Sequence, residues 1–111
     1  MSKLEKSSLA TLTKRMQEIA NMFFTSKKYA DITPKLYDVE TDTSQNQYTI
    51  FTKKVEDAYA TLDPLEQLFI NNDFFYQNYP FWWMEVYPKR TYEMYKRKAI
   101  IHFLRSFFHE V

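Results

Sequence analysis

Apolar residues recur at helical intervals in the first quarter of the chain. The intervals are 3, 4, 3 and 4 residues, and the positions are Leu9, Leu12, Met16, Ile19 and Phe23. This stripe predicts an N-terminal helix within residues 1–26, beginning at about Leu4 and ending at Ser26. Its two heptads fall short of the roughly three or four that are typical of a coiled coil, so packing within one domain is favoured over a dimer seam.

A polar stretch separates this helix from a second stripe. Pro34 and the polar run 38–43 interrupt the helical period, so residues 27–43 are expected to form a connecting loop. The second stripe repeats the 3, 4, 3, 4 spacing, with Tyr48, Phe51, Val55, Ala58 and Leu62. It predicts a helix over about 45–62 and belongs to the remaining part of the chain, 44–111.

The segment LDPLEQLFI carries a strong signal for the start of a third helix. Asp63 suits the N-cap, Pro64 the first helical position and Glu66 the third. The apolar face of this helix is expected to consist of Leu65, Leu68, Phe69 and Ile70.

Two prolines divide the C-terminal third of the chain. Pro80 predicts a short helix over 80–87, which contains both tryptophans, and Pro88 predicts a long last helix over about 88–108. In the last helix an apolar stripe lies opposite a polar one, and its second half, AIIHFLRSFF, is apolar nearly all round. Such a segment must be covered on more than one side. No segment alternates apolar and polar residues with a period of two over more than a few positions, so no strand is predicted. The predicted fold class is all-α, with about five helices in a single domain, 1–111.

Charge is distributed unevenly along the chain. The net charge of the 111 residues is only +1, yet residues 1–87 sum to −3 and residues 88–105 sum to +5. The absence of Cys excludes disulfides and thiolate metal sites, and the absence of Gly excludes glycine-rich phosphate loops. No apolar run is long enough to span a bilayer and no secretory leader is evident, so a cytoplasmic protein without a membrane partner is expected.

The basic segment follows a short helix and a proline turn, as the second helix of a helix-turn-helix does. Such a helix enters the major groove with its first turn near the bases. Lys89 and Arg90 are the candidates for that turn, and Arg90 is the first choice for a base or phosphate contact. Thr91 is assigned to a phosphate and Glu93 to a cytosine amino group. Met94 is assigned to a thymine methyl, and Arg97 with Lys98 to the DNA backbone further along.

The residues also resemble a known family. LDPLEQLFI followed by YPKRTYEMYKRKAIIHFL is similar to region four of bacterial sigma factors and to phage late-gene regulators of the ArpU and RinA type. The pattern positions present are Thr91, Tyr92, Lys96, Lys98, Ala99 and Phe103. The residue pattern WW…TY…KA also resembles that of an uncharacterised protein family of wall-less bacteria. The resemblance implies a C-terminal helix-turn-helix, sequence-specific binding of double-stranded DNA, a role in transcription regulation, and RNA polymerase as a possible partner.

A different function remains open, because charge runs are usually solvated surface. The alternative is a non-enzymatic helical interaction module, homodimeric or bound to RNA polymerase, with Trp83 and Phe81 as anchors for a partner. His102 and His109 lack the spacing of metal ligands. No catalytic constellation, metal site or cofactor is expected, so the chain is not predicted to be an enzyme.

Overall fold

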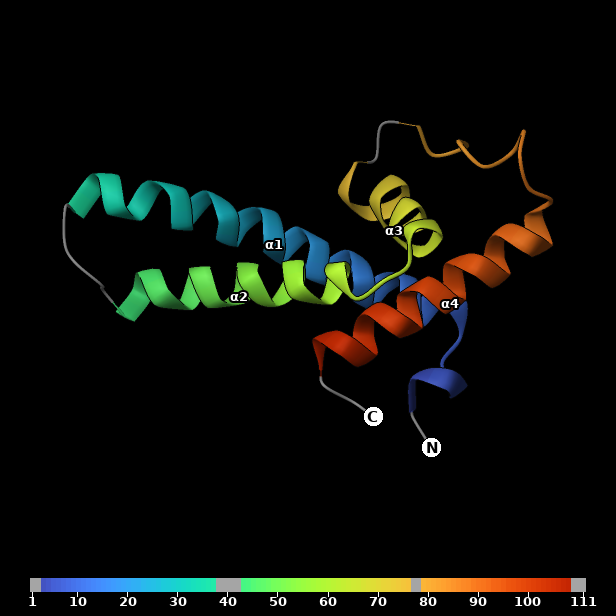
Figure 1. The fold of residues 1–111 in the computed structure, drawn as a ribbon, viewed down its shortest axis with the longest axis horizontal. Coiled ribbons are helices and arrows are strands. Elements are labelled where there is room, and N and C mark those ends of the chain that lie inside the picture. The colour runs from blue at the N-terminus through green and yellow to red at the C-terminus, as the bar shows by residue number, and fades with distance from the viewer. Residues whose placement is uncertain (1–2, 38–42, 77–78, 109–111) are drawn as a thin grey trace.

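The computed structural model describes residues 3–37, 43–76 and 79–108, and within them every regular element is a helix (Figure 1). A short 3₁₀ turn, η1 (Lys3–Lys6), precedes α1 (Leu9–Tyr37) and α2 (Thr43–Ala60). Then α3 (Pro64–Ile70) continues into a π-helix, η2 (Asn71–Phe75), and α4 (Lys89–Phe107) ends the described chain. The all-α class is confirmed for these residues. None of their helices is both long and apolar enough to cross a membrane.

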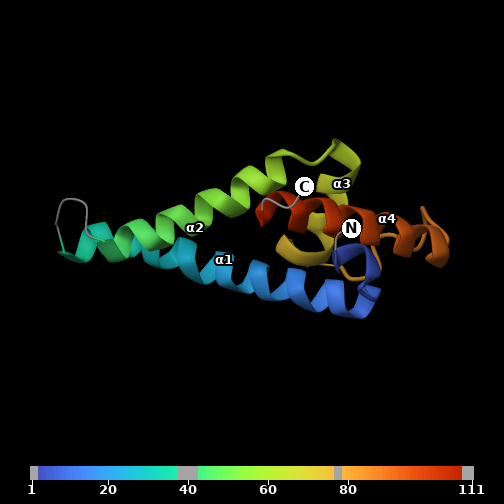
Figure 2. The same cartoon turned by 90° about the horizontal axis from the view of Figure 1, so that it is seen from below.

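The helices α1 and α2 form a long antiparallel hairpin that gives the molecule its 51 Å length (Figure 1). The two helices diverge toward one end, and the C-terminal half of α4 lies in that opening (Figure 2). Four residues of this half are completely buried: Ala99, Ile100, Phe103 and Leu104. α4 as a whole is in contact with α1, α2, α3 and η1, and the burial of these residues confirms that the apolar second half is covered on several sides.

Both predicted stripes line the hairpin. Leu12 and Met16 of α1 and Val55 and Ala58 of α2 are fully buried. However, α1 extends through Pro34 to Tyr37, so the loop expected over 27–43 is wrong for residues 27–37, while 38–42 lie outside the described residues. A proline inside a helix costs roughly 3 kcal/mol. The packing of α1 against α2 offsets this free-energy cost. One contact between the two helices is the stacking of the Tyr29 and Tyr48 rings, whose centroids are 5.1 Å apart.

The start of α3 is the capping box that the sequence predicts. The Asp63 carboxylate accepts a hydrogen bond from the Glu66 backbone N–H at 2.8 Å, and the Glu66 carboxylate accepts one from the Asp63 N–H at 3.1 Å. The predicted apolar face is only half correct. Phe69 and Ile70 are buried, but Leu65 and Leu68 are exposed. The reason is that α3 packs chiefly on α4, and seven residues present one narrow buried face.

The short helix expected over 80–87 is not formed. Residues 80–87 instead make successive turns, with backbone bonds such as Met84 N–H to the Phe81 carbonyl at 3.1 Å. Side chains one residue apart on a helix diverge by about 100°. Trp82 and Trp83 nevertheless both pack on Tyr92, with ring centroids at 6.2 and 4.2 Å. These tertiary contacts favour the irregular backbone, and the described chain therefore has four α-helices rather than about five.

Candidate nucleic-acid interface

The inner side of α4 is fixed by an aromatic cluster around Phe69. The Phe69 ring of α3 stacks on Tyr92 at 5.8 Å and meets the edges of Trp82 at 5.0 Å and Tyr95 at 5.7 Å. Phe69 is 1 % exposed. Because aromatic pairs of this kind add roughly 0.5–1.5 kcal/mol each beyond their burial, the cluster determines which face of α4 turns outward.

A buried carboxylate completes this anchorage. Asp73 of η2 accepts hydrogen bonds from Trp82 Nε1 at 2.9 Å and from the Tyr92 hydroxyl at 2.7 Å. Lys96 Nζ lies 3.7 Å from the same carboxylate, and its side chain is only 17 % exposed. Burial, then the hydrogen bond to Asp73 and the negative charges nearby, raise the pKa of Tyr92 far above its ordinary value. One cation of the basic segment is therefore engaged inside the protein.

The opposite side of α4 carries a line of exposed side chains. Arg90, Met94 and Lys98 follow one another at intervals of four residues, and all three are exposed. Lys89 is exposed in the first turn. Pro88, at the N-cap, offers no side-chain hydrogen bond to the first-turn amides of α4. The positive end of the helix dipole therefore coincides with two cations, an arrangement that attracts anions.

Arg97 lies at the edge of this line. Its Nη1 donates a hydrogen bond to the Ser7 carbonyl at 2.7 Å, which fixes the guanidinium against the start of α1. Together with Met94 and Lys98, Arg97 borders a shallow depression on the outward surface of α4.

Two predicted contact residues lie elsewhere on the helix. Glu93 is half-buried and borders a depression with Leu9 and Lys14 of α1, so it does not share the line of exposed side chains. Thr91 is half-buried as well. The structure thus gathers Arg90, Met94, Arg97 and Lys98 on one side of α4, with Lys89 at its start. Glu93, one helical turn from both Arg90 and Arg97, borders this side where it faces α1.

The two suggested partner anchors differ in exposure. Phe81 is 55 % exposed. Trp83 is half-buried, because its indole stacks on the Tyr92 ring at 4.2 Å with an interplanar angle of 9°. Of the two, only Phe81 presents its ring to solvent in the way that a partner anchor requires.

Sequence reasoning missed Asp73, and it assigned Glu66 to the start of α3 without predicting its burial or its contact with α4. His102 Nδ1 contacts Glu66 Oε2, which joins the second half of α4 to α3. His109 lies outside the described residues. The sequence held only an indirect signal for a buried carboxylate, because buried Trp and Tyr side chains require a hydrogen-bond partner for their polar atoms. Among the described residues no group of three or more His, Cys, Asp or Glu side chains is placed to hold a metal.

Comparison with protein-family models, with curated proteins and with solved structures finds no match to this chain.

Proposed function

We propose that this protein binds double-stranded DNA through the outward side of α4 and acts in transcription regulation. The observation that carries the proposal is the exposed line of Arg90, Met94 and Lys98 on a helix whose other side is fixed by Phe69 and Asp73. The resemblance of the sequence to sigma region four, which includes residues of this same helix, points to the same function.

The spacing along α4 suits a duplex. Eight residues at 1.5 Å each separate Arg90 from Lys98 by about 12 Å along the helix axis. The major groove of B-form DNA is also about 12 Å wide. Arg90 and Lys98 would then reach the two phosphate walls, and Met94 between them would meet base edges, where a thymine methyl is the apolar feature.

The proposed docking mode modifies the helix-turn-helix expected from the sequence. In this proposal α4 is the recognition helix, and its support is α3 together with the turns of residues 80–87. The first turn of α4, with Lys89 and the amides that follow Pro88, would hold one phosphate. Discrimination between DNA sequences would depend on the few side chains that project between the two phosphate backbones, above all on Met94.

Salt dependence gives the sharpest test. For each phosphate contact, log K falls by about 0.9 per tenfold increase in salt concentration. We expect labelled duplexes to bind in fluorescence anisotropy at about 0.05 M salt, and the combined change Arg90→Ala and Lys98→Ala to lower the slope by about 1.8. A duplex selected from a random pool by the parent protein should lose its preference when Met94→Ala is introduced.

A matched control comes from the hairpin. Lys28 and Lys53 are exposed cations on α1 and α2, and replacing both with Ala removes the same charge from a different surface. Circular dichroism verifies that each variant is folded. The proposal fails if the parent protein does not bind duplexes at low salt, or if the hairpin variant weakens binding as much as the α4 variant does.

One observation favours a second candidate, a protein-interaction module. The turn segment before α4 leaves four large apolar side chains more than half exposed: Tyr79, Phe81, Met84 and Val86. Apolar side chains gathered on one surface segment are typical of a contact with another protein. A second copy of the chain or RNA polymerase would bind there. Light scattering with the Phe81→Ser variant tests the homodimer, since a dimer through this segment should dissociate and a monomeric parent would exclude it.

A further inference from the structure

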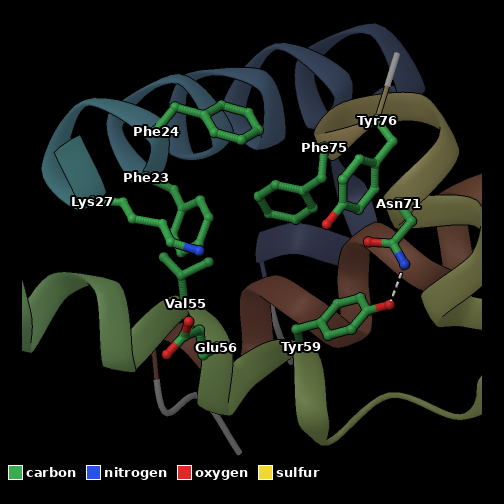
Figure 3. A pocket seen from close by; sticks show the side chains of 9 residues that line it. All are labelled: Phe23, Phe24, Lys27, Val55, Glu56, Tyr59, Asn71, Phe75 and Tyr76. Atoms are coloured by element: carbon green, nitrogen blue, oxygen red, sulfur yellow. Dashed lines mark hydrogen bonds between the residues drawn. The ribbon is translucent and has the colours of Figure 1, made fainter. Parts of the chain in front are cut away.

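A cleft lies between the hairpin and the π-helix, away from the outward side of α4. Side chains from α1, α2 and η2 converge on it, and its volume is about 240 Å³ (Figure 3). Pockets for drug-sized ligands measure roughly 300–1,000 Å³. The cleft therefore has room for a smaller group, of one or two fused rings.

The walls of the cleft are aromatic. Phe75 of η2 meets the rings of Phe23 and Phe24 of α1 edge-on, at 5.4 and 5.9 Å, and points into the space between the helices (Figure 3). Phe24 and Tyr76 remain 47 % and 65 % exposed. Exposed ring surface in the lining of the cleft favours a planar aromatic occupant, because stacking on it buries that surface at little cost in side-chain entropy.

One end of the cleft is polar. The Asn71 amide donates a hydrogen bond from Nδ2 to the Tyr59 hydroxyl oxygen, while its carbonyl Oδ1 is turned toward the cleft (Figure 3). A tyrosine hydroxyl that accepts one hydrogen bond can still donate its own proton. The two side chains thus place an acceptor and a donor next to each other at the end of an aromatic slot. An amide-like edge, with N–H beside C=O, complements this pair.

The backbone supports the same site. Asn71 and Phe75 both belong to η2, whose Tyr76 N–H bonds back to the Asn71 carbonyl. Single-turn π-helices are rare and are found frequently at functional sites. At the mouth, Lys27 of α1 and Glu56 of α2 carry opposite charges, so the rim favours a ligand without net charge.

We propose that this cleft binds a neutral, planar heterocycle of one or two rings that carries a lactam edge, with its N–H donating to Asn71 Oδ1 and its carbonyl accepting from the Tyr59 hydroxyl. The ligand lies against the aromatic lining formed by Phe24, Phe75 and Tyr76. This site goes beyond DNA binding and does not depend on it, since no residue of α4 lines the cleft.

Two probes of matched shape test the proposal on the unaltered protein. Quinolin-2-one has the lactam edge, and 1-methylquinolin-2-one has the same rings with the N–H blocked. We expect quinolin-2-one to shift backbone amide signals of residues 23–27, 55–59 and 71–76 in two-dimensional NMR spectra. The N-methyl compound should bind about tenfold more weakly, because it leaves Asn71 Oδ1 without a donor. Tyr59→Phe should weaken the binding of both compounds, because both carry the carbonyl that accepts from the Tyr59 hydroxyl.

Three outcomes of the titrations with the two probes would overturn the proposal, and a fourth comes from the protein alone. They are equal affinity for both probes, signal shifts outside the cleft, and no shifts up to the solubility limit of quinolin-2-one. Cleft signals that move with protein concentration alone would assign the space to a side chain of a second copy and would equally overturn it. None of these outcomes bears on DNA binding, because the anisotropy assay reports on α4.

Discussion

Replacing Asp73 should destabilise the protein more than replacing any exposed acidic residue. Its side chain is 7 % exposed and accepts hydrogen bonds from Trp82 Nε1 and the Tyr92 hydroxyl, with Lys96 Nζ 3.7 Å away. Hydrogen bonds to charged groups contribute roughly 1.5–3 kcal/mol each. Removing one partner of a buried ion pair costs about 3–5 kcal/mol, because the other charge is left without compensation.

These magnitudes set the expected result. Asp73→Ala removes two hydrogen bonds and leaves Lys96 uncompensated, so the free energy of unfolding should fall by about 3–5 kcal/mol. With an m-value of about 2 kcal/mol/M, the urea midpoint falls by roughly 1.5–2.5 M. Asp73→Asn keeps one acceptor but presents an NH₂ group to the remaining donors, and should lose about half as much. Tryptophan fluorescence follows the unfolding directly, since Trp82 is one of the partners.

A matched control isolates the effect of burial. Asp57 forms an i, i+4 ion pair with Lys53 on α2, and its side chain is 67 % exposed. Exposed pairs of this kind contribute about 0.3–0.5 kcal/mol, so Asp57→Ala should change the urea midpoint only slightly. A loss below about 1 kcal/mol for Asp73→Ala, or equal losses for the two variants, would refute the view that Asp73 anchors α4.

Two further predictions concern the same region. Phe69→Ala should cost about 3–5 kcal/mol in urea unfolding, whereas Leu68→Ala on the same helix should stay within about 1 kcal/mol because Leu68 is 44 % exposed; equal costs would contradict the observed face of α3. Tyr92 should stay protonated in the folded protein at alkaline pH, since burial and the neighbouring Asp73 raise its pKa above 10.0. Its contribution to stability is complete below pH about 10 and is lost as pH rises further, so unfolding free energy should fall less steeply there in Tyr92→Phe than in the parent. Absorbance titration at alkaline pH in which every tyrosine ionises together before unfolding would contradict this.

Periodicity was sufficient to predict the helices whose contacts are regular. The stripes of α1 and α2 and the capping box of Asp63 and Glu66 are encoded within a few residues of each other, so local spacing reveals them. The continuation of α1 through Pro34 could not be predicted in this way, because its stabilisation comes from α2. The same holds for Asp73, whose partners are 9 and 19 residues away in the sequence.

The basic segment illustrates why a charge count overstates a binding surface. Residues 88–105 hold six Lys or Arg side chains, but a helix distributes neighbouring residues to different sides. Lys96 turns inward to Asp73 and Arg97 is fixed on Ser7, whereas Lys89, Arg90 and Lys98 are exposed. Three exposed cations correspond to a slope of about −2.7 in log K against log salt, rather than the value of about −5.4 that six would give. A measured slope near the larger value would require Arg97 and Arg105 to contact phosphates as well, and Lys96 to leave Asp73 when DNA binds. The salt dependence therefore tests the fold of α4 as well as the function proposed for it.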